Sequence, residues 1–200
     1  LADELAYTGW TCVFITNPEA IAEIPALRNS RYVTIGLQNG DTPDHIKHEL
    51  PGGCDLLIVD HYGLDIVFEE CMRPWANKIL IIDDLANRQH DADFLLDQTL
   101  NRLPRDYAGL VPKVCKFFLG GSYSLLNKQF RLKRATALLK REQTFTVKRI
   151  LITIGGVDGR GLSPIVLNAI AKTYLDLEVD IIMGGKSPSL SKVKCIIKDL

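Results

Sequence analysis

Residues 55–63 read "DLLIVDHYG", a continuous apolar run that ends in three side chains able to hold or exchange protons. A second run of the same kind, "KILIIDD", follows at residues 78–84. Continuous rather than alternating hydrophobicity is typical of strands that are buried on both faces of a parallel sheet. Because open parallel sheets bind ligands beyond the carboxyl ends of their strands, the polar residues after these two runs are the first candidates for a functional site.

The same alternation of apolar runs and amphipathic segments extends through the first part of the chain. Further strands are expected at residues 10–16, 31–37 and 93–97. Helices are expected at residues 1–9, 18–29, 42–50 and 64–76. This order of elements predicts an α/β fold with a doubly wound parallel sheet.

A basic amphipathic stretch, "NKQFRLKRATALLKREQ" at residues 127–143, predicts a helix. Its leucines and alanines recur at helical spacing without interleaved aromatic residues, which favours a solvated helix face over a nucleic-acid surface. Beyond it the strand pattern restarts with "VKRILITIGG" and "EVDIIMGG", each ending in two glycines. We therefore expect a first domain at residues 1–140 that includes the helix as a linker, and a second domain that begins at 147 and continues to 200.

Composition narrows the classes of partner and compartment. Lysine plus arginine and aspartate plus glutamate both number 24, so no excess of basic charge favours nucleic-acid binding. The five cysteines are scattered without a CxxC pair, which favours a reducing, cytosolic compartment. No uncharged apolar stretch is long enough for a membrane span. The sequence thus predicts a cytosolic protein without nucleic-acid or membrane partners, and it gives no prediction of oligomeric state.

Two strand ends carry the candidate chemistry, and each has two interpretations. After the first run, Asp60 either caps the next helix beside a loop histidine, or it orients His61 or Tyr62 toward a substrate. The loop "IGGVDGRGLS" at residues 154–163 is either a tight turn or a phosphate cradle at a helix N-terminus. The extra glycines at 159 and 161 favour the cradle, although the loop has neither the Walker nor the GxGxxG spacing.

The acidic segment at residues 83–98, "DDLANRQHDADFLLDQ", raises the question of a metal site together with Asp60 and His61. No HxH, HExxH or cysteine-bearing zinc spacing accompanies it. Acidic loops at strand ends are usually solvated or capping, so we predict no metal.

Five motifs, in this order, resemble the UDP-sugar hydrolases of pseudaminic acid biosynthesis and their spore-coat polysaccharide relatives. They are "IVDHYGLD", "IIDDLANRQHDADFLLDQTL", "YAGLV", "FLGGSYSLLNKQFR" and "ITIGGVDGRGLS". The resemblance implies two Rossmann-like domains of the glycosyltransferase B type that face each other across a cleft, with the nucleotide held mainly by the second. It also implies a UDP-sugar substrate, attack of water on the anomeric carbon, release of UDP and a free diacetamido-trideoxy sugar, and no cofactor.

The resemblance assigns residues to parts of that cleft. On the sugar side, near the attacking water, it implies Tyr62 with Asp60 and His61, and Asp84 in the opposite loop. Beside the nucleotide diphosphate it implies Gly155, Gly156 and Asp158, with Gly161 at a position where asparagine is common. At the crossing between the domains, beside the nucleotide, it implies Tyr123 and Leu126.

The chain departs from the family at both ends. Family members open with a strand and a Gly-His loop whose histidine is the expected general base, and none of the four histidines here holds that position. A later loop with a glutamate that grips the nucleotide would lie beyond Leu200. The resemblance thus implies a fragment with both domains truncated, inactive alone. Two alternatives are a UDP-sugar glycosyltransferase of the same fold and a nucleotide-binding module without activity.

Overall fold

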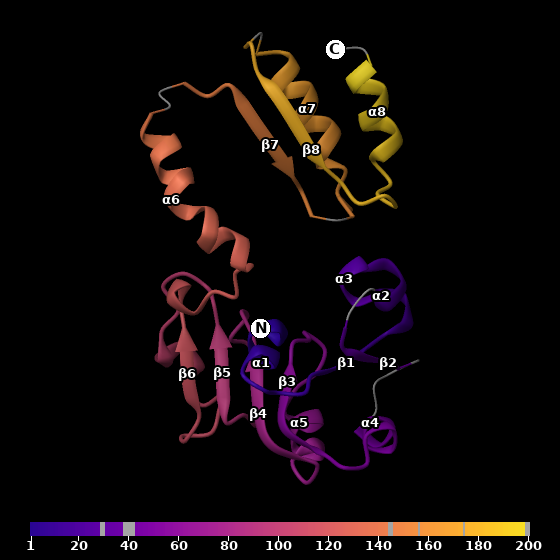
Figure 1. The fold of residues 1–200 in the computed structure, drawn as a ribbon, viewed down its shortest axis with the longest axis vertical. Coiled ribbons are helices and arrows are strands. Elements are labelled where there is room, and N and C mark those ends of the chain that lie inside the picture. Colours follow the sequence, from indigo (N-terminus) through magenta and orange to yellow (C-terminus); the bar gives the residue numbers. More distant parts are fainter. Residues whose placement is uncertain (29–30, 38–42, 144–145, 156, 174, 199–200) are drawn as a thin grey trace. The chain divides into compact units, whose positions relative to one another are not determined.

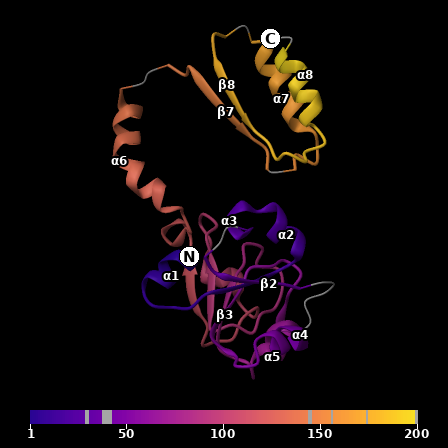
Figure 2. The same ribbon diagram turned by 45° about the vertical axis from the view of Figure 1, so that its right-hand side comes forward.

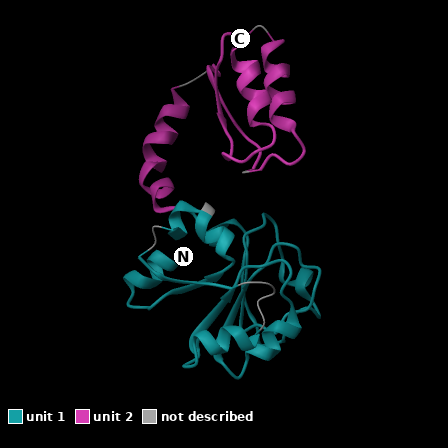
Figure 3. Ribbon diagram, turned by 90° about the vertical axis from the view of Figure 1, so that its right-hand side faces the viewer, with its two compact units in different colours: residues 1–126 teal, residues 127–200 magenta. Residues whose placement is uncertain are grey.

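The computed structural model describes residues 1–28, 31–37, 43–143, 146–155, 157–173 and 175–198. The chain divides into two compact units, residues 1–126 and 127–200 (Figure 3). The helix expected as a linker of the first domain groups with the second unit, so this division falls before the helix rather than after it.

The first unit contains a four-stranded parallel sheet in the order β3-β4-β5-β6 (Figure 1). Its strands are β3 (Cys54–Val59), β4 (Ala76–Ile82), β5 (Phe94–Asp97) and β6 (Lys116–Leu119). Val59 lies opposite Ile81, and Asp97 opposite Leu119, so the carboxyl ends of all four strands open onto one edge. Strand β6 was not among the strands predicted from the sequence.

A second, two-stranded parallel sheet pairs β1 (Val13–Thr16) with β2 (Val33–Gly36). The helices around it are α1 (Ala2–Tyr7), α2 (Pro18–Glu23), α3 (Pro25–Arg28) and α4 (Pro43–Glu49). The prediction of one helix over residues 18–29 is wrong. Ile24 is extended, with φ −93° and ψ 106°, because the ring of the following proline disfavours the helical conformation there.

Helix α5 (Ile66–Met72) follows β3 and is shorter than predicted. It begins after Asp65, whose side chain accepts a hydrogen bond from the Val67 N–H at 3.0 Å. It ends before Pro74, and Ala76 already pairs with Cys54 as the first residue of β4. The predicted helix over residues 64–76 therefore includes the start of a strand.

The core of the first unit forms where α5 packs against the sheet. Met72, Ile79 and Leu95 are fully buried there, and the ring of Tyr107, from the short 3-10 helix η1 (Pro104–Tyr107), closes the same cluster. Burying one such aliphatic side chain stabilises a fold by roughly 1.5–3 kcal/mol. The strands are thus fixed rigidly beneath the edge at which they end.

The second unit is smaller. It consists of α6 (Lys128–Glu142), β7 (Arg149–Thr153), α7 (Leu162–Ala171), β8 (Glu178–Ile182) and α8 (Leu190–Lys198). Strands β7 and β8 are parallel, and α7 and α8 lie on the same side of them (Figure 2).

These elements confirm the α/β class, and the four-stranded parallel sheet is consistent with a Rossmann-like fold. The arrangement of two domains of the glycosyltransferase B type stays a prediction. Among the described residues, no helix is both long and apolar enough to cross a bilayer.

Candidate functional site

A cavity of about 640 Å³ opens at the carboxyl ends of β3, β4 and β5. Its lining comes from residues 60–62, 82–84 and 98–99, and from Leu125. All of these belong to the first unit. The strand-end rule therefore locates the cavity correctly, at the edge where "VDHYG" and "IIDD" both emerge.

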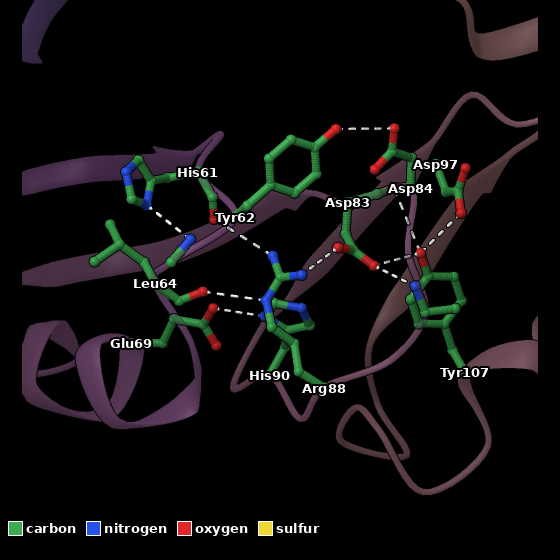
Figure 4. A network of polar contacts seen from close by, with 12 residues as sticks. His61, Tyr62, Leu64, Glu69, Asp83, Asp84, Arg88, His90, Asp97 and Tyr107 are labelled. Atoms are coloured by element: carbon green, nitrogen blue, oxygen red, sulfur yellow. Dashed lines mark hydrogen bonds and ion pairs between the residues drawn. The ribbon is translucent and has the colours of Figure 1, made fainter. Parts of the chain in front are cut away.

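Tyr62 and Asp84, which the resemblance assigns to two sides of a common cleft, both line this cavity (Figure 4). The Tyr62 hydroxyl donates to Asp84 Oδ2 at 3.2 Å, and 67% of the Tyr62 side chain remains exposed. The hydrogen bond to Asp84 and the negative charge of that carboxylate raise the pKa of Tyr62 above its usual value. At neutral pH this tyrosine is a protonated donor held at the cavity surface.

His61 is placed in the cavity wall but is oriented by its own loop. Its Nδ1 accepts a hydrogen bond from the Gly63 N–H at 3.0 Å. A Cβ at Gly63 would come within 3.0 Å of the His61 ring, so glycine permits this fold-back. With Nδ1 occupied as an acceptor, the neutral ring carries its proton on Nε2. In this conformation the ring does not act as a general base.

Asp60 lines the same cavity next to His61. Its side chain is exposed, and among the described residues its carboxylate has no hydrogen-bond partner. The interpretation of Asp60 as a helix cap is wrong, because Asp65 caps α5 instead. The Asp60 oxygens are therefore available to a ligand or to water.

Beneath the cavity lies a buried polar network, and the sequence does not predict its centre, Tyr107 (Figure 4). The Tyr107 hydroxyl lies 2.8 Å from Asp97 Oδ2 and 2.9 Å from Asp83 Oδ2. Its single proton bonds one carboxylate at a time, and an arginine pairs with each: Arg88 with Asp83, and Arg102 with Asp97. Burial, followed by the two hydrogen bonds, raises the pKa of Tyr107 well above its usual range.

The two arginines connect this network to the cavity wall. Arg102 donates to the backbone carbonyl of Asp84 at 2.5 Å, and Arg88 donates to that of His61 at 3.4 Å. Both guanidinium groups are mostly buried, and neither lines the cavity. They act on the site by holding the backbone of the residues that do line it.

Gln98 and Thr99 also line the cavity and were not among the predicted site residues. The signal was present, because they directly follow "DFLLD" just as Asp60 and Asp84 follow their strands. The Gln98 side chain accepts a hydrogen bond from the Leu125 N–H at 2.6 Å. That contact brings Leu125 into the wall.

Tyr123 and Leu126, predicted to lie beside the nucleotide, do not line this cavity. Tyr123 ends the 3-10 helix η2 (Gly121–Tyr123), and its ring packs edge-on against Phe118 with centroids 5.4 Å apart. Leu126 is largely exposed at the end of the first unit.

The predicted diphosphate loop belongs to the second unit. Asp158 is only 5% exposed, and its carboxylate accepts hydrogen bonds from the N–H groups of Leu162 and Ser163, at 2.9 and 3.2 Å. Burial alone would raise the pKa of Asp158, but these hydrogen bonds hold it below its usual value. The Asp158 carboxylate thus supplies a negative charge, from within the chain, to the N–H groups at the start of α7.

Two glycines of that loop have a backbone conformation that favours glycine. Gly155 and Gly161 adopt positive φ, 66° and 63°, which side-chain-bearing residues rarely do. Gly156 lies outside the described residues. Gly161 forms the N-terminal cap of α7 in the left-handed conformation, so the turn itself requires glycine at these two positions.

His90, the histidine of the acidic segment, is buried and has a structural role. His90 Nδ1 lies 2.6 Å from Glu69 Oε1 in the interior, and the other Glu69 oxygen accepts from the Asp91 N–H at 2.6 Å. Within the part of the chain that the structure describes, no group of three histidine, cysteine or acidic side chains is arranged to hold a metal ion.

Comparison with known proteins gives two relatives, while no family model matches the chain. The chain is 31% identical over 145 residues to the UDP-2,4-diacetamido-2,4,6-trideoxy-beta-L-altropyranose hydrolase of Campylobacter jejuni, covering 72% of this chain and 49% of the hydrolase. It is 26% identical over 154 residues to an uncharacterized protein of Methanocaldococcus jannaschii, covering 74% of this chain and 30% of that protein. The chain thus spans about half the length, or less, of these curated relatives. The first match supports a relationship to a family of that kind.

Proposed function

We propose that the protein containing this chain hydrolyses a UDP-linked diacetamido-trideoxy sugar to UDP and the free sugar, in the synthesis of pseudaminic acid. The observation that carries the proposal is the Tyr62–Asp84 wall at the ends of β3 and β4, within a chain 31% identical to a hydrolase named for that substrate. The five ordered motifs include both of these residues.

In the proposed reaction the oxygen of a water molecule attacks the anomeric carbon, and the bond from that carbon to the diphosphate oxygen breaks. The bonding electrons leave with UDP, and one proton of the water passes to a general base. The resemblance implies a histidine outside residues 1–200 for that base. Asp60, with its carboxylate free among the described residues, accepts a hydrogen bond from the attacking water and orients it.

The sugar, rather than the diphosphate, fits the cavity of the first unit. Asp60 and Asp84 carry negative charge at its surface, and no lysine or arginine is among the described residues that line it. Hydroxyl and amide N–H groups of a sugar find acceptors there, whereas a phosphate would be repelled. For the diphosphate the resemblance implies the glycine loop after β7, and this assignment stays a prediction, because the Asp158 carboxylate already accepts from the N–H groups of Leu162 and Ser163 there.

The test is hydrolysis of UDP-2,4-diacetamido-2,4,6-trideoxy-beta-L-altropyranose by the full-length gene product in water enriched in ¹⁸O. We expect UDP without ¹⁸O, because cleavage lies between the anomeric carbon and oxygen. Label in the β-phosphate of UDP would mean attack at phosphorus and would refute the proposed mechanism.

A glycosyltransferase of the same fold is the second candidate, because the resemblance extends to that fold. Adding sugar alcohols as acceptors separates the two activities by their products. A hydrolase yields free sugar at an unchanged rate, whereas a transferase yields a glycoside. Binding of the UDP-sugar without either product would instead favour the nucleotide-binding module.

A further inference from the structure

Gln98 follows β5 directly and lines the cavity with its side chain held in one orientation. The Leu125 N–H donates to it at 2.6 Å, and since an N–H requires an acceptor, the amide oxygen must occupy that end of the side chain. The amide nitrogen then lies on the other side, with two N–H donors. Among the described residues this nitrogen has no hydrogen-bond partner.

The remaining lining of the cavity is chemically complementary to that donor. Asp60 and Asp84 supply carboxylate oxygens, which only accept hydrogen bonds when ionised. Ile82 and Leu125 supply apolar surface. A group that fits all three kinds of surface has one N–H donor, one oxygen acceptor and a small apolar end.

We propose that Gln98 determines the specificity of this cavity for an N-acylated sugar, which rests on the proposed function and deepens it. The Gln98 amide nitrogen donates to the carbonyl oxygen of an acetamido substituent. The N–H of the same substituent donates to Asp60, and its methyl group contacts Leu125. An amino substituent in place of the acetamido group has no oxygen for Gln98, so the contact that selects the acyl group is lost.

The test separates this donor from the anchor to Leu125. In Gln98→Glu a carboxylate oxygen replaces the amide oxygen and still accepts from the Leu125 N–H, while both donors disappear. In Gln98→Met the anchor and the donors are lost together. Binding of free sugars to the full-length gene product is measured by ligand-observed NMR titration, so neither UDP nor turnover is required.

Three probes are used: the 2,4-diacetamido-2,4,6-trideoxy sugar and its two analogues in which one acetamido group is replaced by an amine. We expect Gln98→Glu to weaken binding of the diacetamido sugar about tenfold, the order of one lost hydrogen bond to a group left buried. For one of the two amines, Gln98→Glu should bind no more weakly than the wild-type protein, because this probe has no acyl oxygen for Gln98 and its ammonium charge is attracted by the added carboxylate.

Two results would overturn the inference. If Gln98→Glu binds the diacetamido sugar like the wild type while Gln98→Met does not, Gln98 only anchors the loop. If Gln98→Glu weakens all three sugars equally, the effect of Gln98 is not specific to an acyl group. Hydrolysis of the UDP-sugar without selectivity for the acyl group would contradict this inference but not the proposed function. Acyl selectivity that depends on Gln98, without hydrolysis, would contradict the proposed function but not this inference.

Discussion

Two tyrosine–aspartate contacts lie at the same end of the same sheet, and they differ in burial. Tyr62 reaches Asp84 at 3.2 Å with most of its side chain exposed, whereas Tyr107 reaches Asp97 at 2.8 Å and is 1% exposed. The chemical groups are identical. The comparison teaches that burial, rather than residue type, decides which pair can meet a ligand and which holds the fold.

The buried pair is shared with several other groups of the fold. Asp97 accepts from the Thr99 N–H at 2.8 Å, from Tyr107 and from Arg102. Burial alone would raise the pKa of Asp97, but these hydrogen bonds hold it below its usual value. In the exposed pair, by contrast, Asp84 keeps one oxygen and Tyr62 keeps its lone pairs for a ligand.

The largest effect is expected from Asp97→Ala. Removing this carboxylate leaves Arg102 and Tyr107 without their shared partner in the interior, which should lower the free energy of unfolding by about 3–5 kcal/mol. Urea denaturation measures the loss. The matched control, Asp84→Ala on the exposed side, should change stability by less than about 0.5 kcal/mol. Equal losses in the two variants would remove the distinction between the pairs.

Removing the hydroxyl group from each of the two tyrosines should have opposite effects on activity and on stability. Tyr62→Phe should reduce kcat/KM for the UDP-sugar at least about tenfold without changing stability, since among the described residues its hydroxyl bonds only the exposed Asp84. Tyr107→Phe should lower stability by about 1–2 kcal/mol and leave kcat/KM of the folded protein unchanged. Steady-state kinetics and thermal unfolding of both variants are the measurements. Full activity in Tyr62→Phe would exclude its hydroxyl from the site.

Asp158 extends the comparison to the second unit, because it is a strand-end carboxylate that follows the buried pattern. Asp158→Ala should cost about 1–2 kcal/mol, the usual loss for a helix N-terminal cap, seen as earlier unfolding of residues 127–200 in hydrogen exchange. Asp158→Asn keeps a side-chain oxygen acceptor and should lose less. Tighter UDP binding by Asp158→Asn, without any change in stability, would mean that the carboxylate faces the diphosphate directly.

The smallest effect concerns Asp93, which directly precedes β5 and does not line the cavity. Burial raises its pKa, but hydrogen bonds from Lys78, Arg73 and the Ile79 N–H outweigh that and lower it to about 2. A carboxyl whose pKa is depressed in the folded state contributes stability above its unfolded pKa of 3.8, and that contribution disappears as the pH falls toward 2.

Wild-type protein should therefore exceed Asp93→Asn in stability by about 1 kcal/mol at pH 6, with the difference shrinking below pH 4. Urea titrations at several pH values measure it. A difference that does not vary with pH would show that the ion pairs of Asp93 contribute nothing through its charge.

Sequence patterns predict the exposed residues that line the cavity better than the buried polar network beneath it. Asp60, Tyr62 and Asp84 come together because their strands are long, apolar and parallel, and the ends of such strands share an edge. Gln98 obeys the same positional rule, but it was not predicted because an amide is neither an acid nor a base. Tyr107 could not be predicted, because its partners are chosen by packing between segments ten to twenty-four residues apart.

The loop after β7 illustrates another limit. The pattern "GGVDG" fits both a cradle for an external phosphate and a turn that supplies its own carboxylate. Asp158 adopts φ +47°, and this conformation directs its side chain back to α7. Backbone conformation at one residue thus sets the partners of the carboxylate, and composition does not reveal it.

The most direct test of the assignment of this cavity to the sugar uses ¹⁹F NMR of the full-length gene product labelled with 3-fluorotyrosine. Tyr62→Phe and Tyr107→Phe assign the two resonances. On addition of the diacetamido-trideoxy UDP-sugar or its free sugar product, we predict a shift of the Tyr62 signal and none of the Tyr107 signal. A Tyr62 signal that stays in place while the UDP-sugar is hydrolysed would contradict the assignment of this cavity to the sugar.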